Sequence, residues 1–467
     1  MPVMPMDKRP RPAGVLIGIL LAGCGGGRTP LGTAIGPGTR TPGPIPPSPP
    51  GIAPGKDGLC PSGMDLCGTC GGALCFDLRT SADNCGSCGK QCPPGIPCES
   101  GRCSLYACRG KVTMKTVPVE CRGNGGGMSL GDLDGDGFLD VVCASAGADY
   151  FQYQPAYSVS SFLGKGDGTF VQKVSFPVGR FPTEGAPESG WRTALADLNH
   201  DGILDLIAAA QAPDSLAVRL GQGDGTFGSE ADYPIGADPV GFLVADVSGD
   251  GCPDLAAGLG QAGAVSLSLG AGDGTFAAAT TLPLAGSPGF VTTADWNGDG
   301  IRDLVAMDSY LHILLGTGGG TFAKALDCAI PLDYYSRGGS GQSSALADFD
   351  QDGRMDLPVD DGVLFGMNGC NFSSRFSYPN SLPLVAGDFN GDGLPDLVLS
   401  TTQMSMATPL SLLIANRSAG FSSPQRLPDA NYTMFDTAVA GDLNGDGRLD
   451  MVVGTGGSAM ALLNTCP

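Results

Sequence analysis

One acidic loop of nine residues returns seven times along this chain of 467 residues, and this repetition constrains the fold more than any other feature. Every copy carries Asp at positions 1, 5 and 9, Gly at position 6, and Asp, Asn or Ser at position 3. The copies begin at Asp132, Asp197, Asp246, Asp295, Asp348, Asp388 and Asp442. A spacing of roughly 40–65 residues predicts one supersecondary unit repeated along the chain.

The side chains of the loop have the composition of a calcium site. Ca²⁺ binds about six to eight oxygen atoms, and alternate carboxylates in a tight loop direct their oxygens to one point. Side chains at positions 1, 3, 5 and 9 and the backbone carbonyl at position 7 are the predicted ligands, and Gly at position 6 permits the sharp turn. Up to seven Ca²⁺ ions are therefore expected. The predicted ligands are Asp132, Asp134, Asp136, Phe138, Asp140, Asp197, Asn199, Asp201, Ile203, Asp205, Asp246, Ser248, Asp250, Cys252, Asp254, Asp295, Asn297, Asp299, Ile301, Asp303, Asp348, Asp350, Asp352, Arg354, Asp356, Asp388, Asn390, Asp392, Leu394, Asp396, Asp442, Asn444, Asp446, Arg448 and Asp450.

Metal-free turns are the alternative interpretation of these loops, because Asp, Asn and Gly favour turns without any ion. Seven copies in one frame, all with Asp at position 9, favour metal binding. An EF-hand is excluded, because no Glu stands at position 12 and no amphipathic helix flanks the loops. Ser248 at position 3 is a poorer ligand than Asp or Asn, so the third loop is expected to be the weakest site.

A second pattern around each loop predicts short strands. A short apolar run follows the loop, and a later run ends in Leu-Gly-x-Gly-Asp-Gly-Thr-Phe, whose Gly/Asp segment is typical of a hairpin turn. This motif occupies 163–170, 220–227 and 269–276, and also 315–322 with Gly319 in place of the Asp, with degenerate forms at 365–372 and 414–421. The following strand ends near a proline, at Pro177, Pro234, Pro283, Pro331, Pro379 and Pro428. Helical periodicity is absent, so each unit is predicted to be four antiparallel strands. Such units arranged radially form an all-β, seven-bladed β-propeller.

The acidic loop and the hairpin motif together resemble the FG-GAP/VCBS repeat family, which includes the calcium-binding propeller of integrin α subunits. The resemblance covers about residues 106–467 and implies a propeller with metal ions in its loops. The Phe-Gly…Gly-Ala-Pro motif of integrins is not evident in this sequence. The resemblance therefore implies the fold and the metal sites, but no integrin ligand.

The ring is predicted to close with a strand from the N-terminal side. The last unit ends one strand short, while a spare strand at 111–118 precedes the first acidic loop and ends in Pro118. If this strand supplies the missing outer strand, no sheet edge is left open. On the hairpin frame of the intact units, Cys108 and Cys466 fall on the same turn, which predicts a disulfide between them.

Residues 1–23 have the pattern of a bacterial lipoprotein signal peptide. Basic residues precede an apolar run at 15–21, as in a secretory signal. The Leu-Ala-Gly-Cys sequence that follows resembles the lipobox, which implies lipidation of Cys24; an ordinary signal peptide is the alternative. The apolar run is too short to span a bilayer, so the lipid anchor is the only expected membrane contact. An exported protein of the cell envelope, at the outer membrane or cell surface, is expected.

Two further segments separate the signal from the propeller. Residues 24–59 are rich in Gly and Pro, which predicts a disordered tether. Residues 60–105 contain nine cysteines. Their Cys-x-x-Cys pairs also suit zinc, but export favours a small disulfide module. Without Cys24 an even number of cysteines remains, 16 of the 17 in the chain, and their connectivity beyond the Cys108–Cys466 pair stays open.

Charge and motifs narrow the function. The net charge is −21, and the 23 Asp residues of the loops account for it, so the rest of the chain is close to neutral. No basic patch supports nucleic-acid binding. The two histidines, His200 in the second loop and His312 on a strand, accompany no nucleophile, phosphate-loop or cofactor motif. An enzyme is therefore not expected, although a propeller-based polysaccharide lyase or hydrolase is an alternative, because fold alone does not decide function.

Recognition of a protein or a glycan is the favoured function, and a purely structural envelope module is the third possibility. The longest connections between strands fall on the face opposite the acidic loops, and they are rich in aromatic and Arg side chains, which are favoured anchors of recognition surfaces. The predicted ligand face contains Tyr150, Phe151, Tyr153, Tyr157, Arg180, Phe181, Trp191, Arg192, Tyr334, Tyr335 and Arg337. The sequence predicts neither the ligand nor the oligomeric state.

Overall fold

The computed structural model describes most of the region from residue 112 onward. The described ranges are 112–121, 127–146, 157–178, 192–210, 214–237, 239–308, 310–329, 345–359, 362–367, 369–373, 376–378, 381–401, 410–416, 420–428, 435, 437–455 and 458–466, with 60, 64–69, 72–76, 98–99 and 102–103 before them. Cys24, Cys108 and most of the predicted ligand face lie outside these ranges.

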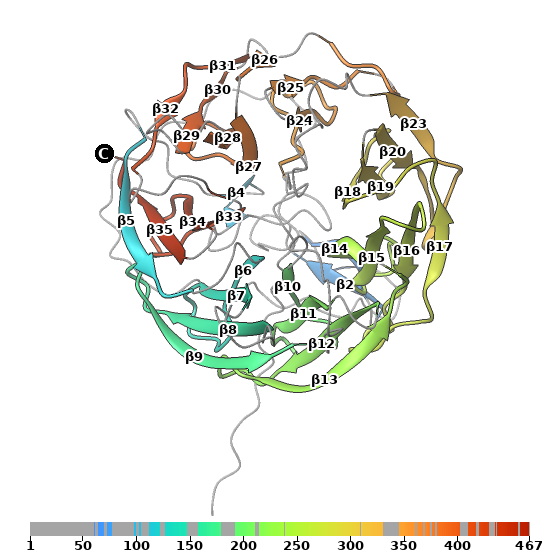
Figure 1. The fold of residues 1–467 in the computed structure, drawn as a ribbon, viewed down its shortest axis with the longest axis horizontal. Helices are drawn as coiled ribbons and strands as arrows, with labels where there is room; N and C mark the ends of the chain where they lie inside the picture. Colours follow the sequence, from blue (N-terminus) through green and yellow to red (C-terminus); the bar gives the residue numbers. More distant parts are fainter. Residues whose placement is uncertain are drawn as a thin grey trace, which may run out of the picture.

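The described part of the chain is all-β and forms a seven-bladed propeller, as predicted (Figure 1). The first four blades each pair four consecutive antiparallel strands, apart from the small hairpin in the fourth. Blade 1 contains β6 (Met128–Gly131), β7 (Asp140–Ala146), β8 (Tyr157–Gly164) and β9 (Phe170–Pro177). Blade 2 contains β10 (Thr193–Ala196), β11 (Asp205–Ala210), β12 (Ser215–Gly221) and β13 (Phe227–Pro234). Blade 3 contains β14 (Pro239–Ala245), β15 (Asp254–Leu259), β16 (Ala264–Ser268) and β17 (Thr280–Pro283). Blade 4 contains β18 (Phe290–Ala294), β19 (Asp303–Met307), β20 (Tyr310–Leu314) and β23 (Leu326–Ala329), with β21 (Gly316–Gly318) and β22 (Thr321–Phe322) at its hairpin.

The last three blades are less regular. Blade 5 contains β24 (Leu357–Val359), β25 (Gly362–Leu364) and β26 (Phe376–Ser377), and a single bridge between Ala347 and Asp356 stands for its inner strand. Blade 6 contains β27 (Ser381–Gly387), β28 (Asp396–Thr401), β29 (Leu410–Leu413) and β32 (Gln425–Arg426), with β30 (Ala415–Asn416) and β31 (Gly420–Phe421) at its hairpin. Blade 7 contains β33 (Thr437–Gly441), β34 (Asp450–Thr455), β35 (Ser458–Asn464) and β5 (Met114–Val119). Two small hairpins precede the ring: β1 (Asp65–Thr69) with β2 (Gly72–Phe76), and β3 (Cys98–Glu99) with β4 (Arg102–Cys103).

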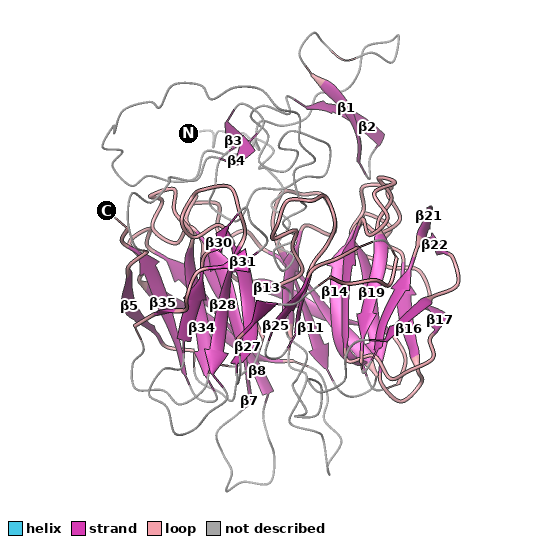
Figure 2. Cartoon of the chain, turned by 90° about the horizontal axis from the view of Figure 1, so that it is seen from above, coloured by secondary structure: helices cyan, strands magenta, loops and turns pink. Residues whose placement is uncertain are grey.

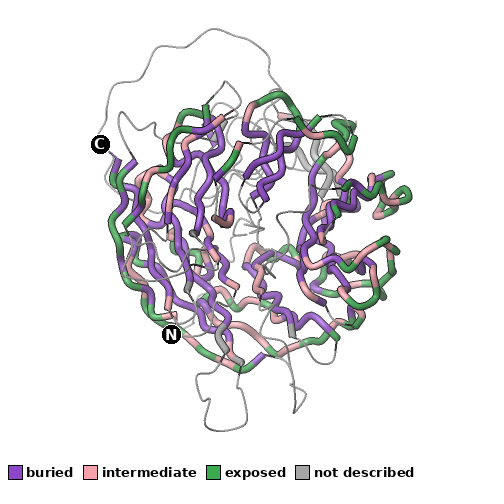
Figure 3. Tube along the Cα trace, turned by 45° about the horizontal axis from the view of Figure 1, so that its top comes forward, coloured by how far each residue is buried: buried purple, intermediate pink, exposed green. Residues whose placement is uncertain are grey.

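The hydrophobic core lies between the blades rather than within one layer. One cluster joins Val142 and Val159 of blade 1 to Leu195 and Leu206 of blade 2, and six similar clusters occur around the ring. Figure 3 shows the buried trace inside and the exposed trace along the outer strands. Each blade therefore buries its two faces only when it has a neighbour on both sides, which explains why the ring closes.

The closing strand is β5, in agreement with the prediction from the sequence. Its six residues pair antiparallel with β35, from Ala459 opposite Val119 to Asn464 opposite Met114. Val117 and Val119 enter the cluster between blades 7 and 1. A second contact shows that Leu463 occupies the position of the hairpin Leu in the other blades. Its side chain packs on Gly168 of blade 1. In the same way, the hairpin leucines of earlier blades pack on a hairpin glycine of the blade that follows: Leu163, Leu220 and Leu269.

A disulfide also links blade 7 to blade 1, where the ring closes. Cys121, just after β5, is bonded to Cys143 in β7 of blade 1, so the exit of the closing strand is covalently tied to the first blade. Cys466 is also disulfide-bonded and buried. Because Cys108 lies outside the described residues, the Cys108–Cys466 pair stays a prediction.

No helix among the described residues has the length and apolar character needed to cross a membrane.

Candidate metal centres in the acidic loops

Each acidic loop connects the inner strand of a blade to the second strand. The hairpin between the third and fourth strands lies beside it, because successive strands are antiparallel. In blades 4 and 6, this hairpin carries the extra strand pairs β21–β22 and β30–β31, which lie on different sides of the ring but toward the same face in Figure 2. The seven candidate sites therefore belong to one face of the propeller.

The Asp at position 1 organises the turn of its own loop. In all seven loops its Oδ2 accepts the backbone N–H of Gly at position 6, at distances of 3.1, 2.9, 2.8, 2.9, 2.9, 2.7 and 2.7 Å in chain order. These glycines have φ between 80° and 90°, a conformation that side chains other than glycine rarely adopt. The loop is thus wound around the position-1 carboxylate by its own backbone donors.

The Asp at position 9 joins the loop to the hairpin. Its Oδ2 accepts the N–H of the residue at position 2, as in Leu133 to Asp140 at 2.7 Å. Its Oδ1 accepts an N–H from the hairpin of the same blade, as in Gly164 to Asp140 at 2.8 Å. All seven blades repeat both bonds. The sequence suggested only a metal ligand at position 9; the structure gives this Asp a connecting role as well.

The carboxylates at positions 1, 3 and 5 converge on one point where all three are present. In the first loop, Asp132, Asp134 and Asp136 each offer an oxygen within 4.8 Å of the others. In the fifth loop, Asp348, Asp350 and Asp352 do the same. These groupings match the predicted ligand set, except that the position-9 Asp is not among them.

The electrostatics of the loops favour a bound cation. Burial, followed by the nearby carboxylates, raises the pKa of Asp140 to about 8, although two backbone N–H groups act against this shift. The pKa of Asp205 and of Asp356 is raised to about 7 for the same reasons, and that of Asp254 to about 6. Buried carboxylates that repel one another require either protons or a cation. The donor set is all oxygen, which suits Ca²⁺.

These shifts predict the pH dependence of the metal-free protein. A carboxyl group whose folded pKa exceeds its unfolded value binds protons more tightly when folded, so stability rises as pH falls between the two values. For Asp140 this window runs from about 8 down to the unfolded value near 4. In EDTA, we expect a higher Tm at pH 5.5 than at pH 8, measured by differential scanning fluorimetry. Calcium-saturated protein is the control, and a metal-free Tm that falls on acidification over this interval would contradict the expectation.

The predicted ligand face lies largely outside the described residues, with one exception of known side-chain position. Arg192 is half-buried at the start of β10, and its guanidinium carbon lies 5.7 Å from the centre of the Phe290 ring in blade 4. Burial lowers the pKa of Arg192 to about 10. Arg192 thus extends from blade 2 across Gly241 of blade 3 to Phe290 of blade 4, while its part in ligand binding stays a prediction.

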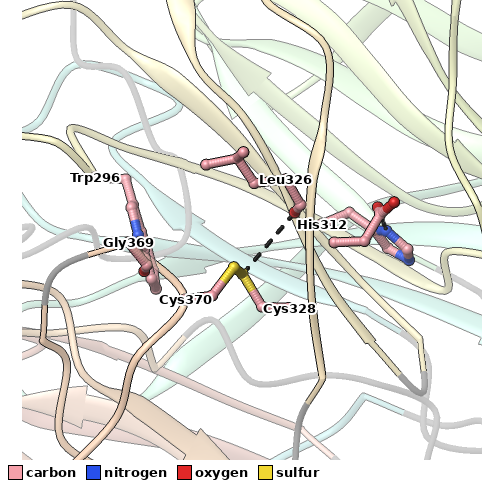
Figure 4. Close-up of a disulfide and its surroundings, with 7 residues drawn as sticks. Trp296, His312, Leu326, Cys328, Gly369 and Cys370 are labelled. Atoms are coloured by element: carbon pink, nitrogen blue, oxygen red, sulfur yellow. Dashed lines mark hydrogen bonds and ion pairs between the residues drawn. A yellow bond between two sulfur atoms is a disulfide. The ribbon is translucent and has the colours of Figure 1, made fainter.

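Two features of blade 4 were not predicted from the sequence. Cys328 in β23 is disulfide-bonded to Cys370 in the hairpin of blade 5, and Trp296 in the fourth loop donates its Nε1–H to the Gly369 carbonyl at 3.2 Å (Figure 4). The degenerate hairpin of blade 5 is therefore tied to blade 4 by a covalent bond and an indole. No sequence pattern pairs these cysteines, because the contact is between blades.

The second feature is the environment of His312. This side chain is fully buried, with Nδ1 2.7 Å from Asp327 Oδ1 and Nε2 3.2 Å from Asp308 Oδ1. Asp308 also accepts backbone N–H groups from Ser287 and Tyr310. His312 therefore connects β20, β23 and the link between blades 3 and 4, which is a structural role.

Comparison with solved structures finds similar chains of low sequence identity. An Agrocybe aegerita lectin that recognises non-reducing terminal N-acetylglucosamine is 20% identical, with 69% of this chain and 82% of that chain covered and a TM-score of 0.45. The periplasmic gluconolactonase PpgL of Pseudomonas aeruginosa is 15% identical, with 68% and 96% covered and a TM-score of 0.45. No curated protein matches the sequence. Neither structural likeness is strong enough to bear on function.

The family comparison is more specific. FG-GAP-like repeats match residues 132–208, 197–257, 246–306 and 388–453, which together make up just over half of the chain. Each match begins at position 1 of an acidic loop, so the matched repeats contain the loop whose hydrogen bonds are described above. The chain belongs to the family of FG-GAP-like repeat proteins.

Proposed function

We propose that this protein is an exported, lipid-anchored propeller that binds Ca²⁺ in its acidic loops and recognises a protein or glycan with the opposite face. The observation that carries the calcium part is the convergence of the carboxylates at positions 1, 3 and 5 in the first and fifth loops. Backbone N–H groups already hold these carboxylates in place, so ion binding requires little rearrangement.

The side chains at positions 1, 3 and 5 would hold the ion, and position 9 would support them through its bonds to the loop and the hairpin. A bound Ca²⁺ supplies positive charge that offsets the repulsion between the carboxylates. Asn at position 3 of four loops offers a neutral oxygen: Asn199, Asn297, Asn390 and Asn444. These loops carry less negative charge, and weaker binding is expected there than in the first and fifth loops.

Export and anchoring rest on the N-terminal sequence, and two disulfides between neighbouring blades support an oxidising compartment. Cys24→Ala removes the only predicted attachment point for lipid. We expect this variant to appear unprocessed or as soluble exported protein, measured by membrane fractionation and mass spectrometry of the N-terminus. Gly25→Ala serves as the matched control, because it leaves the lipid-bearing residue in place. Unchanged fractionation of the Cys24→Ala variant would show that the anchor is elsewhere.

The ligand face is supported by the sequence of the long connections rather than by described geometry. A glycan array and a protein pull-down with the purified exported domain test recognition directly. Binding without product release supports recognition, whereas new reducing ends or unsaturated sugars support the alternative of a polysaccharide lyase or hydrolase. Absence of any ligand on both assays supports the purely structural envelope module.

A further inference from the structure

Four of the seven contacts between neighbouring blades share one packing pattern. In these four, the residue at position 8 of a loop belongs to the same hydrophobic cluster as the residue at position 2 of the preceding loop. Leu204 lies with Leu133, Met355 with Trp296, and Leu449 with Phe389. Across the closing seam, Leu139 lies with Leu443. In these four blades, position 8 therefore lies against the acidic loop of the preceding blade.

The third and sixth loops have Pro253 and Pro395 at position 8, and the fourth loop has a charged residue there, Arg302. By the same geometry, Arg302 is directed toward the third loop, where Val247 occupies position 2. Arg302 is half-buried. Burial lowers the pKa of its guanidinium, while the carboxylates of Asp246 and Asp295 act in the opposite direction, Asp246 more strongly. The guanidinium thus interacts with the position-1 carboxylate of the third loop as well as with its own.

The third loop also differs inside. Ser248 replaces the third ligand, and its hydroxyl lies 3.3 Å from Asp246 Oδ1. The Ser248 N–H donates to Asp254 Oδ2 at 2.9 Å, and the Ser248 carbonyl accepts the Gly319 N–H of blade 4 at 2.9 Å. Both polar backbone groups of Ser248 are thus engaged by the protein itself. This loop has one carboxylate fewer than the first and the fifth, and its neighbouring cation comes from the following blade, whereas the fifth loop has its own Arg354 at 2.7 Å from Asp352.

We propose that Arg302 supplies the third loop with the positive charge that Ca²⁺ supplies to the other loops, so that this loop folds without a metal ion. The proposal rests on calcium binding by the other loops, the function proposed above. A guanidinium stays charged in proteins, and its repulsion of a divalent cation lowers the affinity of the site. The ring then binds one ion fewer than it has acidic loops.

Native mass spectrometry of the calcium-loaded protein tests the ion count. Asp246→Asn with Asp250→Asn removes two carboxylates of the third loop, and we expect the number of bound Ca²⁺ ions to stay unchanged. Ser248→Asp combined with Arg302→Gln builds a three-carboxylate loop without the cation, and we expect one additional ion. Ser248→Asp with Arg302→Lys keeps the positive charge and is the matched control, for which no additional ion is expected. Loss of one ion in the first variant would overturn the proposal.

A second measurement does not depend on metal. In EDTA, we expect Arg302→Gln to lower the Tm by about 2 °C or more, and this loss to shrink markedly in an Asp246→Asn background. Arg354→Gln is the control, because Arg354 Nη1 contacts Asp352 of its own loop at 2.7 Å and should show no coupling to Asp246. Equal losses in both backgrounds would refute the role of Arg302. If coupling is present but the wild-type protein binds no calcium, the proposed function fails while the charge compensation stands.

Discussion

Removal of calcium is expected to lower the Tm of the intact protein by more than about 10 °C, and added Ca²⁺ is expected to restore it. A ligand present at 100 times its dissociation constant stabilises the folded state by about 2.7 kcal/mol per site. Each kcal/mol shifts the Tm of a large domain by about 2 °C. Two or more occupied loops are therefore enough for a Tm shift of about 10 °C. The measurement is a thermal scan with EDTA and then with excess Ca²⁺.

The physical reason lies in the buried carboxylates. Asp140, Asp205 and Asp356 have raised pKa values because of burial first and neighbouring charge second. At pH 8 the metal-free loops contain carboxylates that repel one another, and a bound Ca²⁺ would offset this repulsion. Asp134→Asn and Asp350→Asn together should reduce the effect, since they remove one carboxylate from each of the two richest loops. A melt that EDTA leaves unchanged, with no calcium in native mass spectrometry, would disprove the calcium role.

Val117→Asp opens the ring at one seam. Val117 on β5 is buried in the cluster between blades 7 and 1, so a carboxylate there loses both hydration and apolar contacts. Burying an unpaired charge costs at least several kcal/mol. We expect β5 and β35 to lose protection in hydrogen exchange before the other blades do, with a large fall in Tm.

Thr116→Asp is the matched control for this variant. Thr116 neighbours Val117 on the same strand but is exposed, so the same charge is placed in water. Near-normal exchange of β5 and β35 is expected for this control. If Val117→Asp instead unfolds all blades together, the ring behaves as one cooperative unit, and the idea of a separately weak closing seam is wrong.

The fold was predictable because each blade repeats the same sequence motifs, which set its turns and strand ends. The Gly at position 6 sets the sharp turn of the loop, and the hairpin glycines set the second turn. Pro177, Pro234 and Pro283 end the outer strands β9, β13 and β17 where the sequence placed them. The strand at 111–118 was recognisable because blade 7 lacked an outer strand, and β5 at Met114–Val119 confirms it.

The contacts between blades were not predictable in the same way. Cys328 and Cys370 are 42 residues apart in sequence, and Cys121 and Cys143 are 22 apart, but both pairs meet only when neighbouring blades pack. The role of Asp at position 9 as a backbone acceptor was hidden too, because a predicted metal ligand and a backbone acceptor require the same carboxylate. Asn464 takes over the donor role of the hairpin glycine in blade 7, and no motif marks it.

The hydrogen bonds of the position-9 Asp have a consequence for where the chain of such a ring can be cut and joined. Both of its bonds stay inside one blade, from the loop backbone to the hairpin backbone, and blade 7 keeps them although its last strand comes from a distant part of the chain. Covalent continuity between the third and fourth strands is therefore dispensable for a blade. The chain could therefore begin in another blade. If β35 and β5 are joined by a short linker and the chain is cut at the hairpin of blade 2 or blade 3, we expect a circular permutant with the same fold.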